Sequence, residues 1–177
     1  PDGIVIDAKT GVTGAGAQGR KVDPMYLYTE ANENLQAYGV TTHRHTPEIE
    51  QELSGLVGHP VTVAFTPHLV PLNRGLFTTA SVPLVQAAAT RELLACYREF
   101  YAGEPFVRVL PEGMLPATRT VVGSNFCDVA VIADPRTRRA VCLSAIDNLS
   151  KGGAANGVQN LNLMSGWDER TGLDAPP

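Results

Sequence analysis

The strongest constraint on the fold is a pair of apolar runs separated by a short polar turn. Residues 127–133 and 139–145 flank residues 134–138, a polar stretch that contains Pro135. Two apolar runs of strand length on either side of such a turn are typical of a β-hairpin. The sequence therefore predicts at least one antiparallel pair of strands.

Other segments show the patterns of strands or of helices. Strands are expected at residues 3–8, 38–45, 61–66, 75–82 and 106–110. Helices are expected at residues 28–37, 47–56, 84–101 and 146–164. The segment 38–45 is assigned to a strand because it contains the β-branched residues Val40, Thr41 and Thr42. Runs of strands with only a few helices indicate an α+β domain with a largely antiparallel sheet.

Composition excludes several classes of protein. The 177 residues suit one domain, and a formal net charge of -4 argues against a nucleic-acid partner without forbidding a small anionic substrate. The 3 cysteines form no CxxC pair, so they are interpreted as structural residues of a protein from a reducing, cytoplasmic compartment. No apolar stretch approaches the roughly 20 residues of a membrane span.

A histidine-rich motif carries the clearest chemistry. In an extended strand side chains alternate, so His43 and His45 would project on the same side. Thr46 is expected to cap a helix that Pro47 opens, with Glu48 in its first turn. Two imidazoles and a carboxylate near a helix start suit proton transfer, because histidine titrates near neutral pH.

Two alternatives to this interpretation stay open. A zinc site would need a third ligand, but neither His59 nor His68 lies at a recognisable ligand spacing, so no metal is expected. On this motif alone, two half-exposed strand histidines without a catalytic role are the simpler interpretation.

Two cationic residues border turns that contain glycine. Lys9 precedes the glycine-rich residues 10–16, whose backbone could approach an anion closely, although a phosphate loop would place its lysine after the glycines. Arg74 precedes Gly75, and its planar guanidinium suits a carboxylate or a phosphate. An ordinary surface turn is the common alternative at both positions.

The segment 146–164 is rich in amide side chains and is weakened as a helix by Gly152, Gly153 and Gly157. It still has an apolar face that includes Leu149. The functional interpretation is a helix that docks on another domain and its cofactor. The alternative is a solvated, poorly formed helix.

Six stretches, taken in order, resemble N-acetyl-gamma-glutamyl-phosphate reductases from one end of the chain to the other. They are residues 7–16 (DAKTGVTGAG), 43–48 (HRHTPE), 65–75 (FTPHLVPLNRG), 111–113, 123–125, and 145–149 (AIDNL) with 158–160. The resemblance is specific because both the order and the spacing match. One departure is Ala17-Gln18, since the family runs from its glycines directly to a basic pair, and this displaces Arg20.

The resemblance implies the C-terminal, substrate-binding and dimerisation domain of a two-domain enzyme. The implied fold is α+β, a mixed, mainly antiparallel sheet with helices on one face, as in the C-terminal domain of glyceraldehyde-3-phosphate dehydrogenase. Residues 1–177 would form this domain, with 146–177 as a helix and tail packed on an NADP-binding domain. The glycine-rich loop opens no obvious helix, so it is a poor match to a dinucleotide-binding fingerprint, and no cysteine has the expected setting. The abrupt start of the chain suggests an excised piece, or else a trimmed tail. The dinucleotide-binding motif and the nucleophilic cysteine are therefore both expected before Pro1.

The implied reaction is the NADPH-dependent reduction of N-acetyl-glutamyl 5-phosphate to the 5-semialdehyde plus phosphate, in arginine biosynthesis. A cysteine thiolate attacks the acyl phosphate, phosphate departs, and NADPH reduces the thioester that remains. The chain on its own is expected to be inactive, because it lacks the nucleophile and the nucleotide site.

The resemblance also assigns the proton to the histidine motif. His43 would be the acid–base residue, Glu48 would orient it, and His45 is the second candidate. We expect Glu48 within hydrogen-bond or one-water distance of one of the two histidines.

The remaining roles concern the anionic groups of the substrate and the cofactor. Candidate anion ligands are Lys9, Arg44 and Arg74, and we expect Lys9 or Arg74 in the cleft that the histidines border. Asn148 is expected to reach the nicotinamide side of NADP, by analogy with related dehydrogenases.

Self-association is expected, because helices cover one sheet face and the other face must be buried somewhere. The apolar side chains of that second face are expected to be Val61, Val63, Phe65, Val129 and Val131. Two rival functions stay open: a dehydrogenase of the aspartate-semialdehyde type, and a non-catalytic module for dimerisation or ligand binding.

Overall fold

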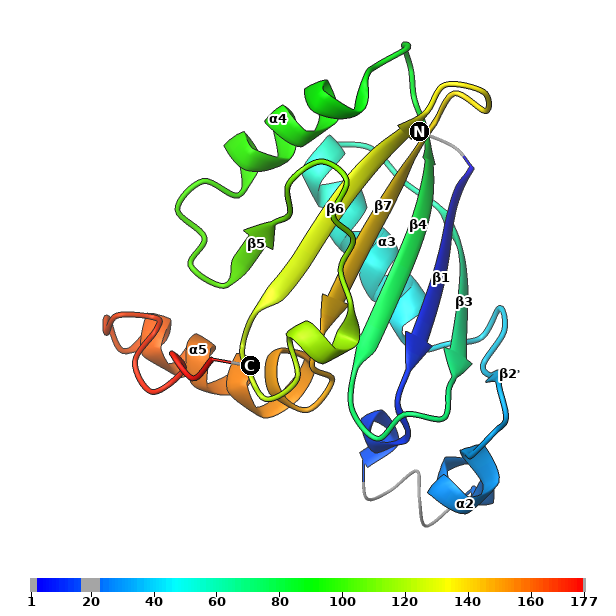
Figure 1. Ribbon diagram of the computed structural model, residues 1–177, viewed down its shortest axis with the longest axis vertical. Helices are drawn as coiled ribbons and strands as arrows, with labels where there is room; N and C mark the ends of the chain where they lie inside the picture. Colours follow the sequence, from blue (N-terminus) through cyan, green and yellow to red (C-terminus); the bar gives the residue numbers. More distant parts are fainter. Residues whose placement is uncertain (1–2, 17–22, 177) are drawn as a thin grey trace.

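The computed structural model describes residues 3–16 and 23–176, which form one seven-stranded sheet with helices packed against it (Figure 1). The strands are β1 (Ile4–Thr10), β2 (Gln36–Ala37), β3 (Val63–Leu69), β4 (Leu76–Pro83), β5 (Val107–Val109), β6 (Cys127–Asp134) and β7 (Arg139–Ile146). Their order is β2-β3-β1-β4-β7-β6-β5. Among the described strands only the pairs β1–β3 and β5–β6 are parallel, so the predicted mixed, mainly antiparallel sheet is confirmed. The expected displacement of Arg20 lies outside the described residues.

The predicted hairpin is present as β6 and β7, with Asp134 opposite Arg139 at its end. The Asp134 carboxylate closes the turn, because it accepts hydrogen bonds from the Arg136 N–H at 3.0 Å and the Thr137 hydroxyl at 2.7 Å. β4 pairs with the other side of β7, so the hairpin lies inside the sheet and not at its edge.

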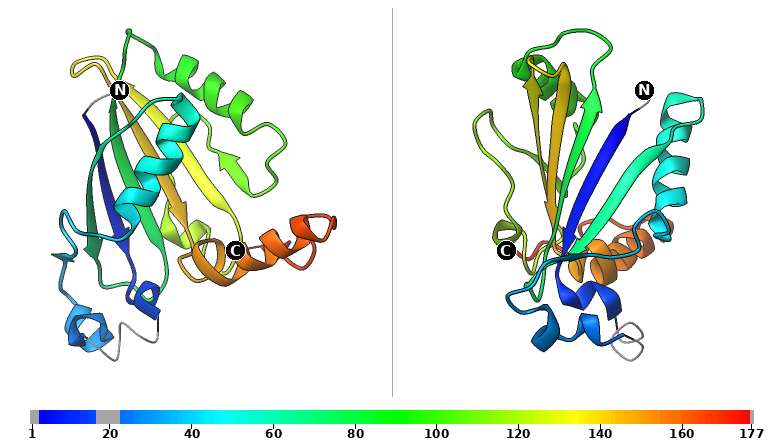
Figure 2. Two further views of the ribbon diagram at one scale, coloured as in Figure 1. Left: turned by 180° about the vertical axis from the view of Figure 1, so that it is seen from behind. Right: turned by 90° about the vertical axis from the view of Figure 1, so that its right-hand side faces the viewer.

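Two helices cover one face of the sheet (Figure 2). These two helices are α3 (His45–Val57) and α4 (Thr90–Phe100). The other described helices are α2 (Tyr28–Ala31) and α5 (Ala155–Met164), and the shorter elements are η1 (Val12–Ala15), η2 (Pro24–Tyr26), η3 (Thr118–Thr120) and the π-helical η4 (Ser150–Ala154). Leu53 of α3 packs on the buried Ile6, and the buried Leu94 of α4 packs with Val131. The expectation of helices on one sheet face is therefore confirmed. None of the described helices is long and apolar enough to cross a membrane.

The segment expected to be a strand at residues 38–45 is a turn instead. Gly39 and Thr41 have positive φ angles of 55° and 63°, and the Thr42 N–H donates to the Gly39 carbonyl at 3.0 Å. α3 then begins at His45, so Thr46 lies inside its first turn and does not cap it. The strand and cap predictions are wrong because a left-handed turn at Gly39 overrides the local preference of β-branched residues.

Other element boundaries differ in smaller ways. The helix expected at residues 28–37 is only α2, followed by β2. The helix expected at residues 84–101 starts only at Thr90, where the Glu92 carboxylate accepts the Ala89 N–H at 2.7 Å. Pro47 and Glu48 lie in the first turn of α3, as predicted. The last helix begins with the π-helical η4 and becomes regular only in α5.

The register of the strands decides which side chains face away from the helices. Ile4 and Ile6 pack with α3, so alternation turns Val5, Asp7 and Lys9 to the opposite face. Through pairing with β1, β4 and β7, this open face also holds aliphatic and aromatic side chains. They are Phe77, Ile132, Val141 and Leu143.

The expectation for the apolar residues of the second face is wrong. Val61, Val63 and Phe65 pack with the core under α3, and Val131 packs with α4. A shift of one residue moves a whole strand pattern to the other side of a sheet. The sequence pattern alone does not fix that shift.

Candidate active site

A cleft of about 740 Å³ lies where β1 and β3 end. Its walls include Thr10 and Leu69 from the strand ends, residues 42–45 at the start of α3, and Asn148 and Gly152 after β7. It is thus built from segments far apart in the sequence, and it brings together polar groups that no single motif contains. A concave site with a few converging polar side chains is the usual form of an active site.

His43 lies in this cleft among aromatic rings. Its ring centroid is 5.4 Å from that of Tyr38, 5.3 Å from that of Phe65 and 4.9 Å from that of His45, all in edge-to-face arrangements. The rings fix the imidazole plane and shield one part of it from water. The side chain stays partly exposed on the cleft side.

The backbone of the next turn fixes the proton of His43. The His45 N–H donates to His43 Nδ1 at 3.2 Å. Nδ1 is therefore an acceptor, and the neutral ring carries its proton on Nε2. Burial lowers the pKa of His43, the nearby charges of His45 and Arg44 lower this pKa further, and the Glu48 carboxylate raises it. The lowered pKa keeps His43 neutral near pH 7, as a proton acceptor must be.

Glu48 influences His43 through its charge and not through a direct contact. In the part of the chain that the structure describes, Glu48 makes no hydrogen bond or ion pair with either histidine. The orienting hydrogen bond comes instead from the backbone of His45. A single bridging water between Glu48 and a histidine stays a prediction.

Arg44 is the sequence-predicted cation that lies in the cleft. It occupies the N-cap position of α3 and is exposed, without an ion-pair partner in residues 3–16 and 23–176. The start of a helix of this length attracts anions through its exposed N–H groups. Arg44 and the start of α3 together form the positive side of the cleft.

Neither Lys9 nor Arg74 lines this cleft, so the expectation that one of them would do so is wrong. Ala8 and Thr10 face the cleft, and strand alternation turns Lys9 to the other side of the sheet. Arg74 forms an ion pair, Nη2 to Oδ2 at 2.6 Å, with the fully buried Asp147.

Asn148 does line the cleft, but both ends of its amide are bonded within the chain. Its Oδ1 accepts the Gly75 N–H at 2.7 Å, and its Nδ2 donates to the Thr13 hydroxyl at 3.0 Å. In this arrangement the amide does not offer a carboxamide ligand both a free donor and a free acceptor.

The sequence missed several residues of the cleft. Phe65 shares one face of β3 with Pro67 and Leu69, so the correct register would have identified it. Tyr26 comes from η2 and Asp23 is its N-cap residue. Neither has a signal in the sequence, because only the tertiary fold brings η2 beside the histidines.

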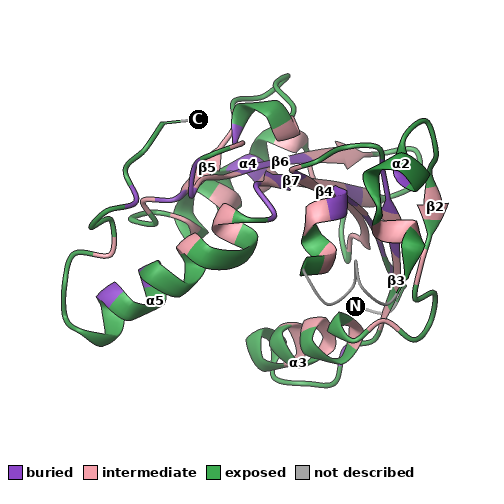
Figure 3. Ribbon diagram, turned by 90° about the horizontal axis from the view of Figure 1, so that it is seen from below, coloured by how far each residue is buried: buried purple, intermediate pink, exposed green. Residues whose placement is uncertain are grey.

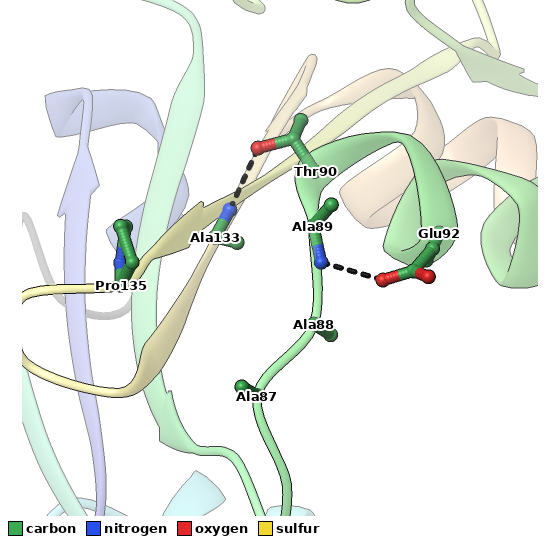
Figure 4. Close-up of a pocket in the computed structure, with 7 residues that line it drawn as sticks. All are labelled: Ala87, Ala88, Ala89, Thr90, Glu92, Ala133 and Pro135. Carbon is green, nitrogen blue, oxygen red and sulfur yellow. Dashed lines mark hydrogen bonds between the residues drawn. The ribbon is translucent and has the colours of Figure 1, made fainter.

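A second hollow, of about 510 Å³, lies between the hairpin tip and the start of α4 (Figure 4). It is lined by Ala87, Ala88, Ala89, Thr90, Glu92, Ala133 and Pro135. Its polar side chains are occupied by backbone groups, because the Thr90 hydroxyl accepts the Ala133 N–H and the Glu92 carboxylate accepts the Ala89 N–H. It therefore offers little chemistry compared with the histidine cleft.

The cysteines and metal ligands of the described residues do not form a second reactive centre. Burial raises the pKa of the Cys127 thiol to about 11 and also raises that of Cys142, so both stay protonated at neutral pH. Cys96 is exposed on α4. No group of three or more His, Cys, Asp or Glu side chains in residues 3–16 and 23–176 is placed to hold a metal ion.

The described residues thus form a helix-covered mixed sheet with a histidine and an arginine in one cleft. The sequence profile of semialdehyde dehydrogenase, dimerisation domain, matches residues 1–148. The chain belongs to this family.

Sequence comparison gives more specific relatives. The chain is 57% identical over 171 residues to the N-acetyl-gamma-glutamyl-phosphate reductase of Desulforamulus reducens, covering 97% of this chain and 49% of that protein. It is 54% identical over 173 residues to the reductase of the same name from Symbiobacterium thermophilum, with the same two coverages. The chain thus spans about half the length of these relatives, and the resemblance seen in its motifs is confirmed along the whole chain.

Solved structures show the same fold. The aspartate semialdehyde dehydrogenase II of Vibrio cholerae, complexed with ASA, matches with a TM-score of 0.69 over 92% of this chain and 54% of that chain. The enzyme from Francisella tularensis matches with a TM-score of 0.67. Sequence identities of 17% and 14% mean that these matches establish the fold alone.

Proposed function

We propose that this chain is the substrate-binding and dimerisation half of an NADP-dependent N-acetyl-gamma-glutamyl-phosphate reductase of arginine biosynthesis, acting in the cytoplasm. The whole enzyme would convert N-acetyl-glutamyl 5-phosphate to N-acetyl-glutamate 5-semialdehyde and phosphate. Identity above 50% to reductases of that name over nearly the whole chain supports this proposal. The nucleophilic cysteine and the nucleotide site would come from the half of the relatives that this chain does not span.

The observation that carries the proposal is the neutral, oriented imidazole of His43 in the cleft. A thiol that attacks an acyl phosphate must first lose its proton, and Nε2 of His43 would accept it. Phosphate then leaves with the electrons of the broken C–O bond, while the new C–S bond forms the thioester. Hydride addition to the thioester would leave the oxyanion of a thiohemiacetal, and the same Nε2 would return its proton to that oxygen. The C–S bond would then break and the hydroxyl proton would pass back to the sulfur, which releases the semialdehyde and restores the thiol.

His45 and Glu48 would tune this proton transfer. The Glu48 charge raises the pKa of His43 and the His45 charge lowers it, so the two residues act in opposite directions on the same imidazole. His45 in addition supplies the backbone N–H that holds the ring. We assign His43 as the acid–base residue and the other two as residues that act through it.

Arg44 and the start of α3 would bind an anionic group of the substrate. The substrate carries a carboxylate and a phosphate, and a planar guanidinium can contact either with two parallel hydrogen bonds. Lys9 and Arg74 lie outside the cleft and are not part of the proposed site.

The described residues do not fit a nucleotide site of their own. The Asn148 amide, expected near the nicotinamide, is bonded at both ends. The described part of the glycine-rich loop after β1 forms the 3-10 turn η1 and not the start of an α-helix, which a dinucleotide-binding motif requires. NADPH, bound to the other half of the enzyme, would supply the hydride. This chain would contribute the cleft and the proton.

The last helix supports a docking role for residues 146–177. Most of the α5 ribbon is coloured as exposed in Figure 3. In α5 the polar Gln159 and Asn162 are buried, whereas Leu161 is 53% and Met164 is 87% exposed. This is the reverse of an ordinary surface helix, whose apolar stripe faces the core. We propose that the NADP-binding domain packs on this apolar side. That domain would lie in the half of the relatives that this chain does not span.

The open face of the sheet supports a homodimer. Phe77, Ile132, Val141 and Leu143 share this face and are half-buried, and α3 and α4 lie on the other side (Figure 2). The family to which the chain belongs is described as a dimerisation domain. We propose that a second copy covers this face about a two-fold axis.

Turnover of the complete protein encoded by the parent gene tests the function. Phosphate-dependent NADP reduction is measured with N-acetyl-glutamate 5-semialdehyde and, in parallel, with aspartate semialdehyde. Preference for the N-acetylated substrate is the expected result. Preference for aspartate semialdehyde would move the enzyme to the rival class, and no turnover of either would support a non-catalytic module. The 177-residue chain assayed alone is expected to show no turnover.

A further inference from the structure

Two consecutive residues after β7, Asp147 and Asn148, are almost completely buried, with 0% and 7% of their surface exposed. A buried carboxylate or amide destabilises a protein unless its polar atoms are paired. The partners of these two side chains come from four separate stretches of the chain. The pair therefore forms a junction, and this junction lies next to the cleft.

The Asp147 carboxylate joins three of these stretches. It accepts hydrogen bonds from the N–H groups of Gly123 at 2.7 Å, Leu149 at 2.8 Å and Ser150 at 3.2 Å. Arg74 adds the ion pair at 2.6 Å. Burial acts to raise the pKa of Asp147, but these hydrogen bonds outweigh it and the pKa is lowered. The carboxylate is thus charged in the folded protein, and Arg74 supplies its counter-charge.

Asn148 adds the fourth stretch, the glycine-rich loop after β1. Its amide connects the Gly75 N–H with the Thr13 hydroxyl, which in turn donates to the Asn73 carbonyl. The loop also bonds directly to the same segment, since the Gly11 N–H donates to the Gly75 carbonyl at 2.9 Å. A Cβ at Gly11 would lie 2.7 Å from the Leu72 carbonyl oxygen, so the two backbones could not approach this closely with another residue there.

Two of the stretches tied together by the junction, the glycine-rich loop and the turn after β7, line the cleft. Gly14 and Ala15 of the loop, Asn148 itself, and Gly152 all line it. The Gly152 N–H donates to the Asp147 carbonyl at 2.9 Å, which fixes the turn that contains it. A displacement of Asp147 would therefore move both the loop and the turn relative to His43, which lines the same cleft.

We propose that Asp147 and Asn148, with Arg74 as the counter-charge, are positioning residues that set these two segments of the cleft against His43. Arg74 neutralises a buried carboxylate and is not a ligand of the substrate. Asn148 holds the glycine-rich loop and is not a ligand of the cofactor. The catalytic consequence rests on the proposed reductase function, whereas the junction itself does not.

Steady-state kinetics of the complete reductase separate positioning from binding at Arg74. Arg74→Gln leaves the buried carboxylate without a counter-charge, so kcat is expected to fall roughly a hundredfold, the scale of a small misplacement of catalytic groups. The KM for phosphate is expected to stay within about twofold, as uniform binding is not removed. Adding Asp147→Asn removes the unpaired charge and is expected to restore kcat at least about tenfold.

The opposite pattern overturns the proposal. If Arg74 binds the substrate anion, Arg74→Gln raises the KM for phosphate and Asp147→Asn rescues nothing. If Arg74→Gln does not fold, Arg74→Lys keeps the charge but not the planar fork, and the same split between kcat and KM decides. Full activity of Arg74→Gln would also overturn it.

Asn148→Asp tests the second half of the junction. The aspartate keeps an acceptor for the Gly75 N–H but loses the donor to Thr13, so kcat is expected to fall while the KM for NADPH stays unchanged. An increase confined to the KM for NADPH would make Asn148 a cofactor ligand and contradict the proposal.

Thermal unfolding of the 177-residue chain distinguishes failure of the junction from failure of the function. The wild type, Arg74→Gln, Asp147→Asn and the double variant form a cycle, and the double variant is expected to melt higher than Arg74→Gln. Strict additivity of the two melting shifts would show no coupling and would reject the junction. A wild-type enzyme without reductase activity would instead reject the proposed function and leave this result unaffected.

Discussion

Replacing His43 by asparagine in the complete reductase is the sharpest test of the acid–base site. The asparagine oxygen can accept the hydrogen bond that the His45 N–H now gives to Nδ1 at 3.2 Å. The variant would nevertheless lack a group that exchanges protons near neutral pH. Loss of a general acid–base residue reduces turnover by roughly 10²–10⁴-fold, so kcat is expected to fall at least about a hundredfold.

The substitution is expected to leave the protein folded. The His43 ring is partly exposed, and the main contacts that the substitution removes are the edge-to-face contacts with Tyr38 and Phe65. Aromatic contacts of this kind contribute about 0.5–1.5 kcal/mol. In a domain of this size about 1 kcal/mol corresponds to about 2–4 °C in Tm, so a decrease of only a few degrees is expected.

Initial rates and melting curves of the wild type and the variant give both quantities. His45→Asn is the matched control, because it keeps the backbone N–H that orients His43 and removes the neighbouring ring with its charge. The control should retain most of the turnover of the wild type. The reasoning is refuted if His43→Asn keeps kcat within about tenfold of the wild type, or if the control loses as much as the variant.

Three further predictions follow from the geometry. Because the pKa of His43 lies below its ordinary 6.5, the base form persists to lower pH, and the acid limb of kcat/KM should lie below pH 6.5. Arg44→Gln removes a charge that lowers this pKa and should move the acid limb to higher pH. Glu48→Gln removes a charge that raises this pKa and should move the acid limb to lower pH. A pH–rate profile that does not change in either variant contradicts the role of His43. Leu143→Arg on the open sheet face should weaken the dimer at least about a hundredfold, since it would bury an unpaired charge, and sedimentation equilibrium of the 177-residue chain measures this; an unchanged dimer would place the interface elsewhere. Leu161→Asp on the exposed side of α5 should lower the Tm of the complete protein but hardly that of the 177-residue chain, and equal shifts in both would argue against docking of the other half on α5.

Much of the fold was predictable from local patterns. The apolar runs 127–133 and 139–145 became β6 and β7, and the turn between them is closed by Asp134, whose side chain hydrogen-bonds its own neighbours. A hairpin of this kind depends on contacts between residues close in the sequence. Pro47 and Glu48 were placed in the first turn of α3 for the same reason, because helix starts follow local rules.

The failures in the fold arose where a distant or unusual backbone state decided the outcome. Residues 38–45 have the composition of a strand, yet Gly39 and Thr41 take positive φ angles and the segment turns. The second sheet face was assigned to Val63 and Val131, which in fact face the helices. Alternation identifies two faces of a strand but does not state which of them meets a helix.

The sequence by itself determined the family, the mixed sheet and the motif that contains His43 and Arg44, because these depend on residue order and on neighbours along the chain. Only the tertiary structure decided that Arg74 pairs with a buried carboxylate and that Lys9 lies on the sheet face opposite to the cleft. The role of a charged side chain is set by its surroundings. A guanidinium in a cleft is free to bind a ligand, whereas a guanidinium beside a buried carboxylate serves as its counter-ion. Those surroundings come from segments more than fifty residues apart, such as Arg74 and Asp147, whose meeting no local pattern encodes.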